Sequence, residues 1–118
     1  MSEKLFVGVG RLSLFFRQAR NLKDKRNQLQ SLKQKLRNQG WSVSEVGHTE
    51  DPKRGFLGFV YTGNSYHQVE LAFEQVLSLL IGNFEVVRKT KEILEFDADP
   101  TFDDSLLARS LLGDTDEP

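Results

Sequence analysis

Apolar residues recur at every second position in four segments of the chain, and this spacing is typical of β-strands. The alternation is clearest in residues 5–16, where every even position is apolar or glycine and the odd positions include Arg11 and Ser13. We therefore expect the even positions of this strand to face the core. The other predicted strands cover residues 41–48, 54–62 and 84–96.

Two further segments, residues 20–40 and 63–83, follow the 3.6-residue period of an amphipathic helix. Leucines form the apolar stripe of the first segment, and valine and phenylalanine dominate that of the second. Each segment begins with two polar residues at the spacing of a helix cap and ends near a glycine. These residues are Asn21, Asp24 and Gly40 in the first helix, and Ser65, Gln68 and Gly82 in the second.

The order of the predicted elements is β-α-β-β-α-β. This order is the signature of an α+β ferredoxin-like sandwich, in which a four-stranded antiparallel sheet carries both helices on one face. We assign residues 1–96 to this domain and residues 97–118 to an acidic tail with a possible short helix at 104–112. Such a short helix is marginal alone in water and needs a surface to dock on, either the domain itself or a partner; the alternative is a solvated tail without such a contact.

The charge is distributed unevenly along the 118 residues, although the formal net charge is only −1. Residues 1–91 carry 15 basic and 8 acidic side chains, a net charge of +7, whereas residues 92–118 carry Arg109 against nine acids, a net charge of −8. This asymmetry predicts a basic surface on the domain and an acidic C-terminal segment.

The segment KRGFLGFVY, residues 53–61, is similar to the aromatic motif on the third strand of RNA-recognition motifs. It contains one additional residue, Leu57, between Phe56 and Gly58. Because side chains of a strand alternate between faces, Phe56 and Phe59 should point to opposite sides of the sheet. Phe6 on the first strand should also point inward. We therefore favour ordinary packing of these aromatic residues over a base-stacking platform.

Three short blocks resemble the YlxP-like family of small bacterial proteins of unknown function. The family pattern A-R-S-L-K-x-K-R corresponds to residues 19–26, and the pattern V-S-V-A-E-V-D-H corresponds to residues 41–48. Arg54, Leu57 and Gly58 match a third block, R-A-V-L-G. The resemblance covers about residues 5–96, and the Leu-Lys-x-Lys-Arg block is its most specific part.

The resemblance implies a ferredoxin-like fold and, because members often occur among translation and ribosome-maturation genes, a role close to the ribosome. The chain departs from the family pattern at several positions. Arg17 replaces a common proline, Asn21 replaces serine, and Gly47 replaces the aspartate of the second block. Asp51 and Pro52 replace apolar residues, so a function that needs that aspartate or an apolar hairpin tip is in doubt.

The first predicted helix is strongly basic. Residues 17–37 carry eight basic side chains and one acid. On a helical wheel, Arg26, Lys33 and Arg37 fall within about 40° of one another and Lys23 lies beside them. Lys25 falls within the leucine stripe, where its stem can pack while its ammonium reaches water or a carboxylate such as Glu45.

This pattern leads to a first functional hypothesis, a non-catalytic RNA-binding or ribosome-associated accessory protein. A ridge of cations on one helix face suits phosphate contacts, although an ordinary solvated helix face has similar residues. The predicted RNA-binding residues are Arg20, Lys23, Arg26, Lys33, Arg37 and Arg54. The acidic tail could compete with RNA for these cations, in which case its removal should raise RNA affinity.

The alternative hypothesis is a protein-interaction module. The face of the sheet opposite the helices should carry apolar side chains that invite dimerisation or another partner, with the tail as a second docking element. The predicted interaction residues are Val7, Val9, Phe56 and Val60.

Nothing in the sequence favours an enzyme, a metal site, a cofactor or a small-molecule substrate. There is no cysteine, and the two histidines, His48 and His67, have no neighbouring metal-ligand spacing. A weak acid–base pair of Glu45 and His48 is less favoured than a hydrogen-bonded histidine in the hairpin. Gly8 and Gly10 resemble the start of a dinucleotide loop, but no helix follows directly. We expect a cytoplasmic protein that does not enter membranes.

Overall fold

Four strands and two helices follow one another in the predicted order within residues 3–47 and 50–99, the part of the chain that this computed structural model describes. The elements are β1 (Lys4–Phe15), α1 (Leu22–Asn38), β2 (Ser42–Glu45), β3 (Arg54–Gly63), α2 (Tyr66–Leu80) and β4 (Glu85–Asp97). The predicted bounds are correct to within about three residues, and β2 is the shortest element. Gly47 follows β2 closely, and its positive backbone φ of 86° is incompatible with an extended strand, so the strand ends before it.

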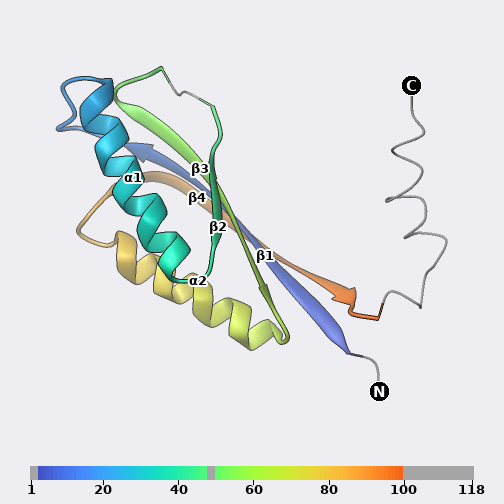
Figure 1. The fold of residues 1–118 in the computed structure, drawn as a ribbon. Coiled ribbons are helices and arrows are strands. Elements are labelled where there is room, and N and C mark those ends of the chain that lie inside the picture. Colours follow the sequence, from blue (N-terminus) through green and yellow to red (C-terminus); the bar gives the residue numbers. More distant parts are fainter. Residues whose placement is uncertain (1–2, 48–49, 100–118) are drawn as a thin grey trace, which may run out of the picture.

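The strands form one antiparallel sheet in the order β2-β3-β1-β4. Both helices cover the same face of this sheet and leave the other face open (Figure 1). The arrangement confirms the predicted ferredoxin-like sandwich. The register between β1 and β3 is continuous from Phe6 opposite Gly63 to Phe15 opposite Arg54, so β3 accommodates Leu57 without a bulge.

The core lies between the helices and the covered face of the sheet. On β1 the even positions Leu12 and Leu14 are buried, as predicted, and on β3 the odd positions Leu57 and Phe59 join them. Three leucines of α1 and the valine–phenylalanine stripe of α2 form the other side of the core, opposite the sheet. Burial of this apolar surface is the main force that holds both helices to the sheet.

A cluster of aromatic rings fills the core against Gly8 and Gly10 of β1. The ring centroid of Trp41 lies 4.9 Å from that of Phe59 and 4.9 Å from that of Phe73. The ring of Phe59 lies over Gly10, its partner on β1, so closely that a Cβ atom at Gly10 would be 2.4 Å from the ring. Glycine at this position therefore makes the aromatic packing possible.

The predicted caps are present at the start of both helices. The Asn21 side chain accepts a hydrogen bond from the Asp24 backbone N–H at 2.9 Å, and the Ser65 hydroxyl accepts one from the Gln68 N–H at 3.1 Å. In each case the second side chain reaches back to the residue before the cap, Arg20 or Asn64. These bonds satisfy backbone donors that a helix start otherwise leaves unpaired.

The last strand ends beside the first residues of the domain. The Lys4 ammonium lies 2.7 Å from a carboxylate oxygen of Asp97, which holds these ends of β1 and β4 together. The tail predicted from residue 97, with its short helix at 104–112, lies outside the described residues beyond residue 99.

Gly10→Ala is expected to lower the free energy of unfolding by about 1–3 kcal/mol, because the added methyl group must displace the Phe59 ring from the aromatic cluster. Urea unfolding measured by Trp41 fluorescence provides the test. Gly58→Ala is the matched control, since its nearest neighbour would be at an ordinary 3.8 Å. We expect the control to change stability by less than about 0.5 kcal/mol. Equal effects of the two changes would contradict this account.

Candidate nucleic-acid interface on the first helix

The apolar stripe of α1 determines which of its side chains face solvent. Leu29, Leu32 and Leu36 are buried against the sheet. On one flank of this stripe lie Lys23, Arg26 and Arg37, which are exposed, and Lys33, which is half-buried. We call these four residues the basic ridge.

The basic ridge faces away from α2. Gln28 lies on the opposite flank of the leucine stripe and lines a cavity together with Asn83, Phe84 and Glu85, which follow α2. The ridge is therefore directed toward the side of the sheet where β2 forms the free edge.

The side chains of the basic ridge have no carboxylate within 4.0 Å among residues 3–47 and 50–99. Five other cations are also without an ion pair in this part of the chain but lie apart from the ridge, namely Arg11, Lys35, Lys53, Arg88 and Lys89. Most other cations here are paired. The pairs are Lys4–Asp97, Arg17–Glu85, Arg20–Asp24, Lys25–Glu45, Arg54–Asp51 and Lys91–Glu70.

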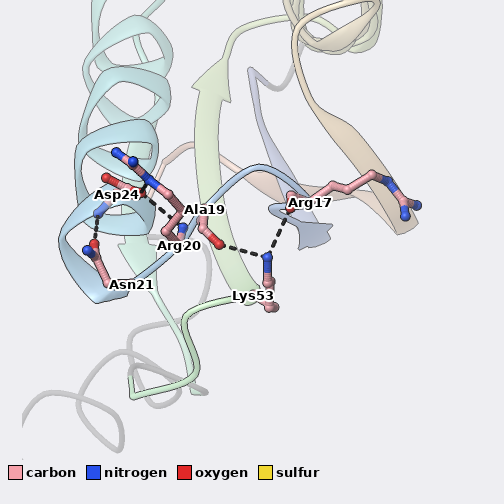
Figure 2. A network of polar contacts seen from close by, with 6 residues as sticks. All are labelled: Arg17, Ala19, Arg20, Asn21, Asp24 and Lys53. Carbon is pink, nitrogen blue, oxygen red and sulfur yellow. Dashed lines mark hydrogen bonds and ion pairs between the residues drawn. The ribbon is translucent and has the colours of Figure 1, made fainter.

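Arg20 and Arg54, which the sequence grouped with the ridge, do not belong to it. The Arg20 guanidinium lies 3.2 Å from the Asp24 carboxylate, one turn before the ridge begins (Figure 2). Arg54 opens β3 and its guanidinium lies 3.4 Å from Asp51. Each has a nearby acid that compensates its charge.

The loop that leads into α1 is fixed by Lys53. The Lys53 ammonium donates to the backbone carbonyls of Arg17 at 2.9 Å and Ala19 at 2.7 Å (Figure 2). The backbone of Lys53 also accepts a hydrogen bond from the Phe16 N–H. The segment before β3 thus ties down the start of the helix that bears the ridge.

Lys25 is completely buried, in the position that the leucine stripe predicts. Its ammonium donates to the Arg54 backbone carbonyl at 3.1 Å and lies 3.8 Å from Glu45, whose side chain is 20% exposed. The predicted partner Glu45 is therefore confirmed. These contacts join α1 to β2 and β3 through one charged group. His48, the other residue considered near Glu45, lies outside the described residues, and His67 is exposed in the first turn of α2.

Asp24 has a local electrostatic role at the start of α1. The Arg20 backbone N–H and then the Arg20 guanidinium donate to its carboxylate, and these hydrogen bonds lower the pKa of Asp24 from its usual value. A negative charge in the first turn also suits the positive end of the helix.

The aromatic residues of β1 and β3 do not form a base-stacking platform. Phe59 is buried in the core, whereas Phe56 is half-buried on the open face. Phe6 packs against the core from the covered side. The predicted separation of Phe56 and Phe59 is therefore correct.

The open face carries the four residues predicted for it. Val7, Val9 and Phe56 are half-buried and Val60 is 38% exposed. Leu94 and Phe96 of β4 extend this apolar surface, although the sequence did not predict them there. Apolar and polar residues do not alternate regularly along 84–96, so only the pairing with β1 places these two residues on the open face.

Residues 7–92 match the family described as "Protein of unknown function (DUF503)", and the chain belongs to this family. The match covers nearly the whole described fold, including the basic helix and Glu45. No curated protein matches the chain. Within the described residues, no helix is long and apolar enough to cross a membrane.

Several solved structures have a similar overall arrangement. They include protein SO0527 from Shewanella oneidensis, at 16% identity and a TM-score of 0.46, covering 80% of this chain and 92% of that one. A dimeric ferredoxin-like protein of unknown function from Thermobifida fusca has 10% identity and a TM-score of 0.44, with 79% and 91% covered. The flavoprotein MtVAO713 from Myceliophthora thermophila has 17% identity and a TM-score of 0.48, with 86% and 19% covered. At such scores these similarities say nothing about function.

Glu45→Gln is expected to destabilise the protein more than Lys25→Met does. The first change leaves a completely buried ammonium without its carboxylate, at a cost of up to about 3–5 kcal/mol. The second leaves a carboxylate on a side chain that is 20% exposed, although its Oε2 atom is buried, and replaces the lysine stem with an apolar one. Urea unfolding of both variants and of the double variant tests this order. The reverse order would show that the Lys25–Glu45 contact does not govern the stability of this site.

The lowered pKa of Asp24 predicts a pH-dependent contribution to stability. A depressed native pKa stabilises the fold above the unfolded value of about 3.9 and loses this effect as the pH falls through the native pKa. Wild-type protein should therefore lose more stability between pH 7 and pH 3 than Asp24→Asn does. Thermal unfolding at both pH values measures the difference, and identical losses would contradict the assigned role.

Proposed function

We propose that this protein is a non-catalytic RNA-binding accessory protein that contacts RNA phosphates through the basic ridge of α1. The observation that carries the proposal is the clustering of Lys23, Arg26, Lys33 and Arg37 on one flank without a compensating carboxylate in the described residues. Of the eleven other lysines and arginines in the described residues, six are paired with an acid of the fold, and the five that are not lie apart from the ridge. The ridge is therefore available for an external anion.

The dimensions of the ridge suit several phosphates. From Lys23 to Arg37 the helix advances fourteen residues, or about 21 Å at 1.5 Å per residue. Neutralising phosphates over this distance releases counterions and gives binding that weakens steeply with salt. Structured RNA is read largely through phosphates and 2′-hydroxyls, which a rigid cationic helix can contact without base-specific recognition.

The YlxP-like resemblance of residues 19–26 and 41–48 supports a place near the ribosome in the bacterial cytoplasm. Residues 19–26 contain the first two residues of the ridge, together with the buried Lys25 that holds the helix. RNA or a ribosomal particle is the partner that this reading implies. No cofactor or catalytic residue enters the proposal.

A second candidate function is protein interaction through the open face of the sheet. It is favoured by one observation, the exposure of Leu5, Leu94 and Phe96 beside Val60 on a face without helices. Apolar residues that are contiguous on a surface commonly mark a docking site. The two functions use opposite faces and are compatible.

Replacing two ridge arginines, Arg26→Gln with Arg37→Gln, should weaken binding to structured RNA and flatten its salt dependence. Loss of two phosphate contacts lowers the slope of log K against log salt by about 1.4–1.8. Filter binding between low and physiological salt measures affinity and slope together.

The matched control is Lys35→Gln with Arg17→Gln. It removes the same charge from the opposite flank of α1 and from the loop before it, where Arg17 is already paired with Glu85. We expect the control to retain most of the wild-type slope. Equal losses in both double variants, or an affinity that is insensitive to salt, would overturn the proposed role of the ridge.

A further inference from the structure

The open face of the sheet has an apolar end and a basic end. At the apolar end, adjacent strands pair Leu5 with Phe96, Val7 with Leu94, and Val9 with Val60. Leu5 and Val60 are each 38% exposed, Leu94 is 42% exposed and Phe96 is 50% exposed. We call these six residues the open-face patch. Nothing in the described part of the chain covers the patch.

The basic end is a cavity of about 290 Å³ further along β1 and β4. Two guanidiniums line it, those of Arg11 and Arg88, and Val46 and Phe56 form an apolar wall. Arg11 donates from Nε to the Thr90 hydroxyl at 3.0 Å, which fixes its orientation. No carboxylate lines this cavity among the described residues, although Glu92 lies between it and the open-face patch, opposite Val9.

We propose that the C-terminal segment of the same chain, residues 103–117, docks on this open face. The sequence predicts a short helix at 104–112, followed by Asp114, Asp116 and Glu117. The apolar side of this helix consists of Leu106, Leu107, Leu111 and Leu112. The leucines would cover the open-face patch, and the acids after them would reach the arginine cavity. In this segment the leucines come first and most of the acids follow them, which matches a face whose apolar end lies beside the end of β4 and whose basic end lies further along the sheet.

The length and starting point of the segment fit this path. β4 ends at Asp97, next to Phe96 of the open-face patch. Seven residues from Asp97 to Asp104 span up to about 23 Å, enough to turn back over the sheet. A nine-residue helix then covers about 14 Å. The distance from Leu5 to Arg11 along β1 is about 20 Å, so the acids at 114–117 come within reach of Arg11 and Arg88.

Charge favours this segment over a second copy of the chain. Residues 100–118 carry five acids and one arginine. A second copy placed on this face would bring its own Arg11 and Arg88 toward a surface that already has two guanidiniums. In addition, a tethered segment is present at a high effective concentration, so a weak contact suffices. The open face is opposite the helices, so this docking leaves the basic ridge free and differs from competition with RNA.

A single spin label tests the proposal directly, because the chain has no cysteine and Ser110→Cys provides one labelling site. In the full chain, paramagnetic broadening should be strongest for the backbone amides of Val9, Val60 and Leu94 and weaker for those of Arg26 and Arg37. Broadening centred on α1 would overturn the proposal in favour of a tail on the ridge. The absence of specific broadening would also overturn it.

A mixed sample distinguishes the chain's own tail from that of a second copy. Isotope-labelled protein without a spin label is combined with spin-labelled protein that is not isotope-labelled. We expect no broadening in this sample. Broadening of the open face in this mixed sample as well as in the single-species sample would show that a second copy is the occupant.

Three variants of the labelled chain test the contacts separately. Leu107→Ser with Leu111→Ser should strongly reduce the broadening, because it removes two of the four leucines of the apolar side without changing the charge. Arg88→Gln should reduce it and make it less sensitive to salt. Arg37→Gln is the matched control on the basic ridge and should leave it unchanged. An effect of Arg37→Gln as large as that of Arg88→Gln would contradict docking on the open face.

Discussion

The buried ammonium of Lys25 is the constraint on which the candidate interface depends. It lies among leucines on α1 and contacts Glu45 of β2 and the backbone carbonyl of Arg54 in β3. A buried charge is costly unless its partners are correctly placed, so few rotations of α1 about its axis are compatible with these contacts. Since the basic ridge is on the same helix, fixing this rotation also fixes the direction in which the ridge points.

The two faces of the sheet are organised by different chemistry. The covered face combines glycines on β1 with large rings on β3 and α2, so that aromatic side chains lie close to the backbone. The open face has aliphatic residues at one end and arginines at the other. The helices thus provide a cationic flank on one side of the domain, and the sheet provides a mixed apolar and basic surface on the other.

Most of the fold follows from the sequence because its apolar periodicity is strong and the helix ends have capping residues. The inward direction of Leu12 and Leu14, the separation of Phe56 from Phe59, and the burial of Lys25 all follow from spacing alone. Which cations belong to the basic ridge, however, does not follow from spacing. Arg20 and Arg54 have partners whose carboxylates approach only when the two loops take their native shape.

The register between β4 and β1 also could not be predicted from the apolar periodicity of either segment, because register depends on contacts between segments that are distant in the sequence. Leu94 and Arg88 acquire their place on the open face only through this register, and the bulge opposite Ser13 and Leu14 shifts it within the strand. Features that arise within one element could therefore be predicted, whereas the open-face cavity required the assembled sheet.

The bulge in β4 has a consequence for the behaviour of the protein at high concentration. β4 is a long strand at an edge of the sheet, and an edge of this kind can recruit the backbone of another molecule into fibrous assemblies. Val87 is the extra residue that breaks the ladder, and Lys89 and Lys91 place charge along the same edge. A bulge and charged side chains on an edge strand both oppose pairing with the edge of another molecule, so this margin of the sheet is poorly suited to backbone pairing between copies.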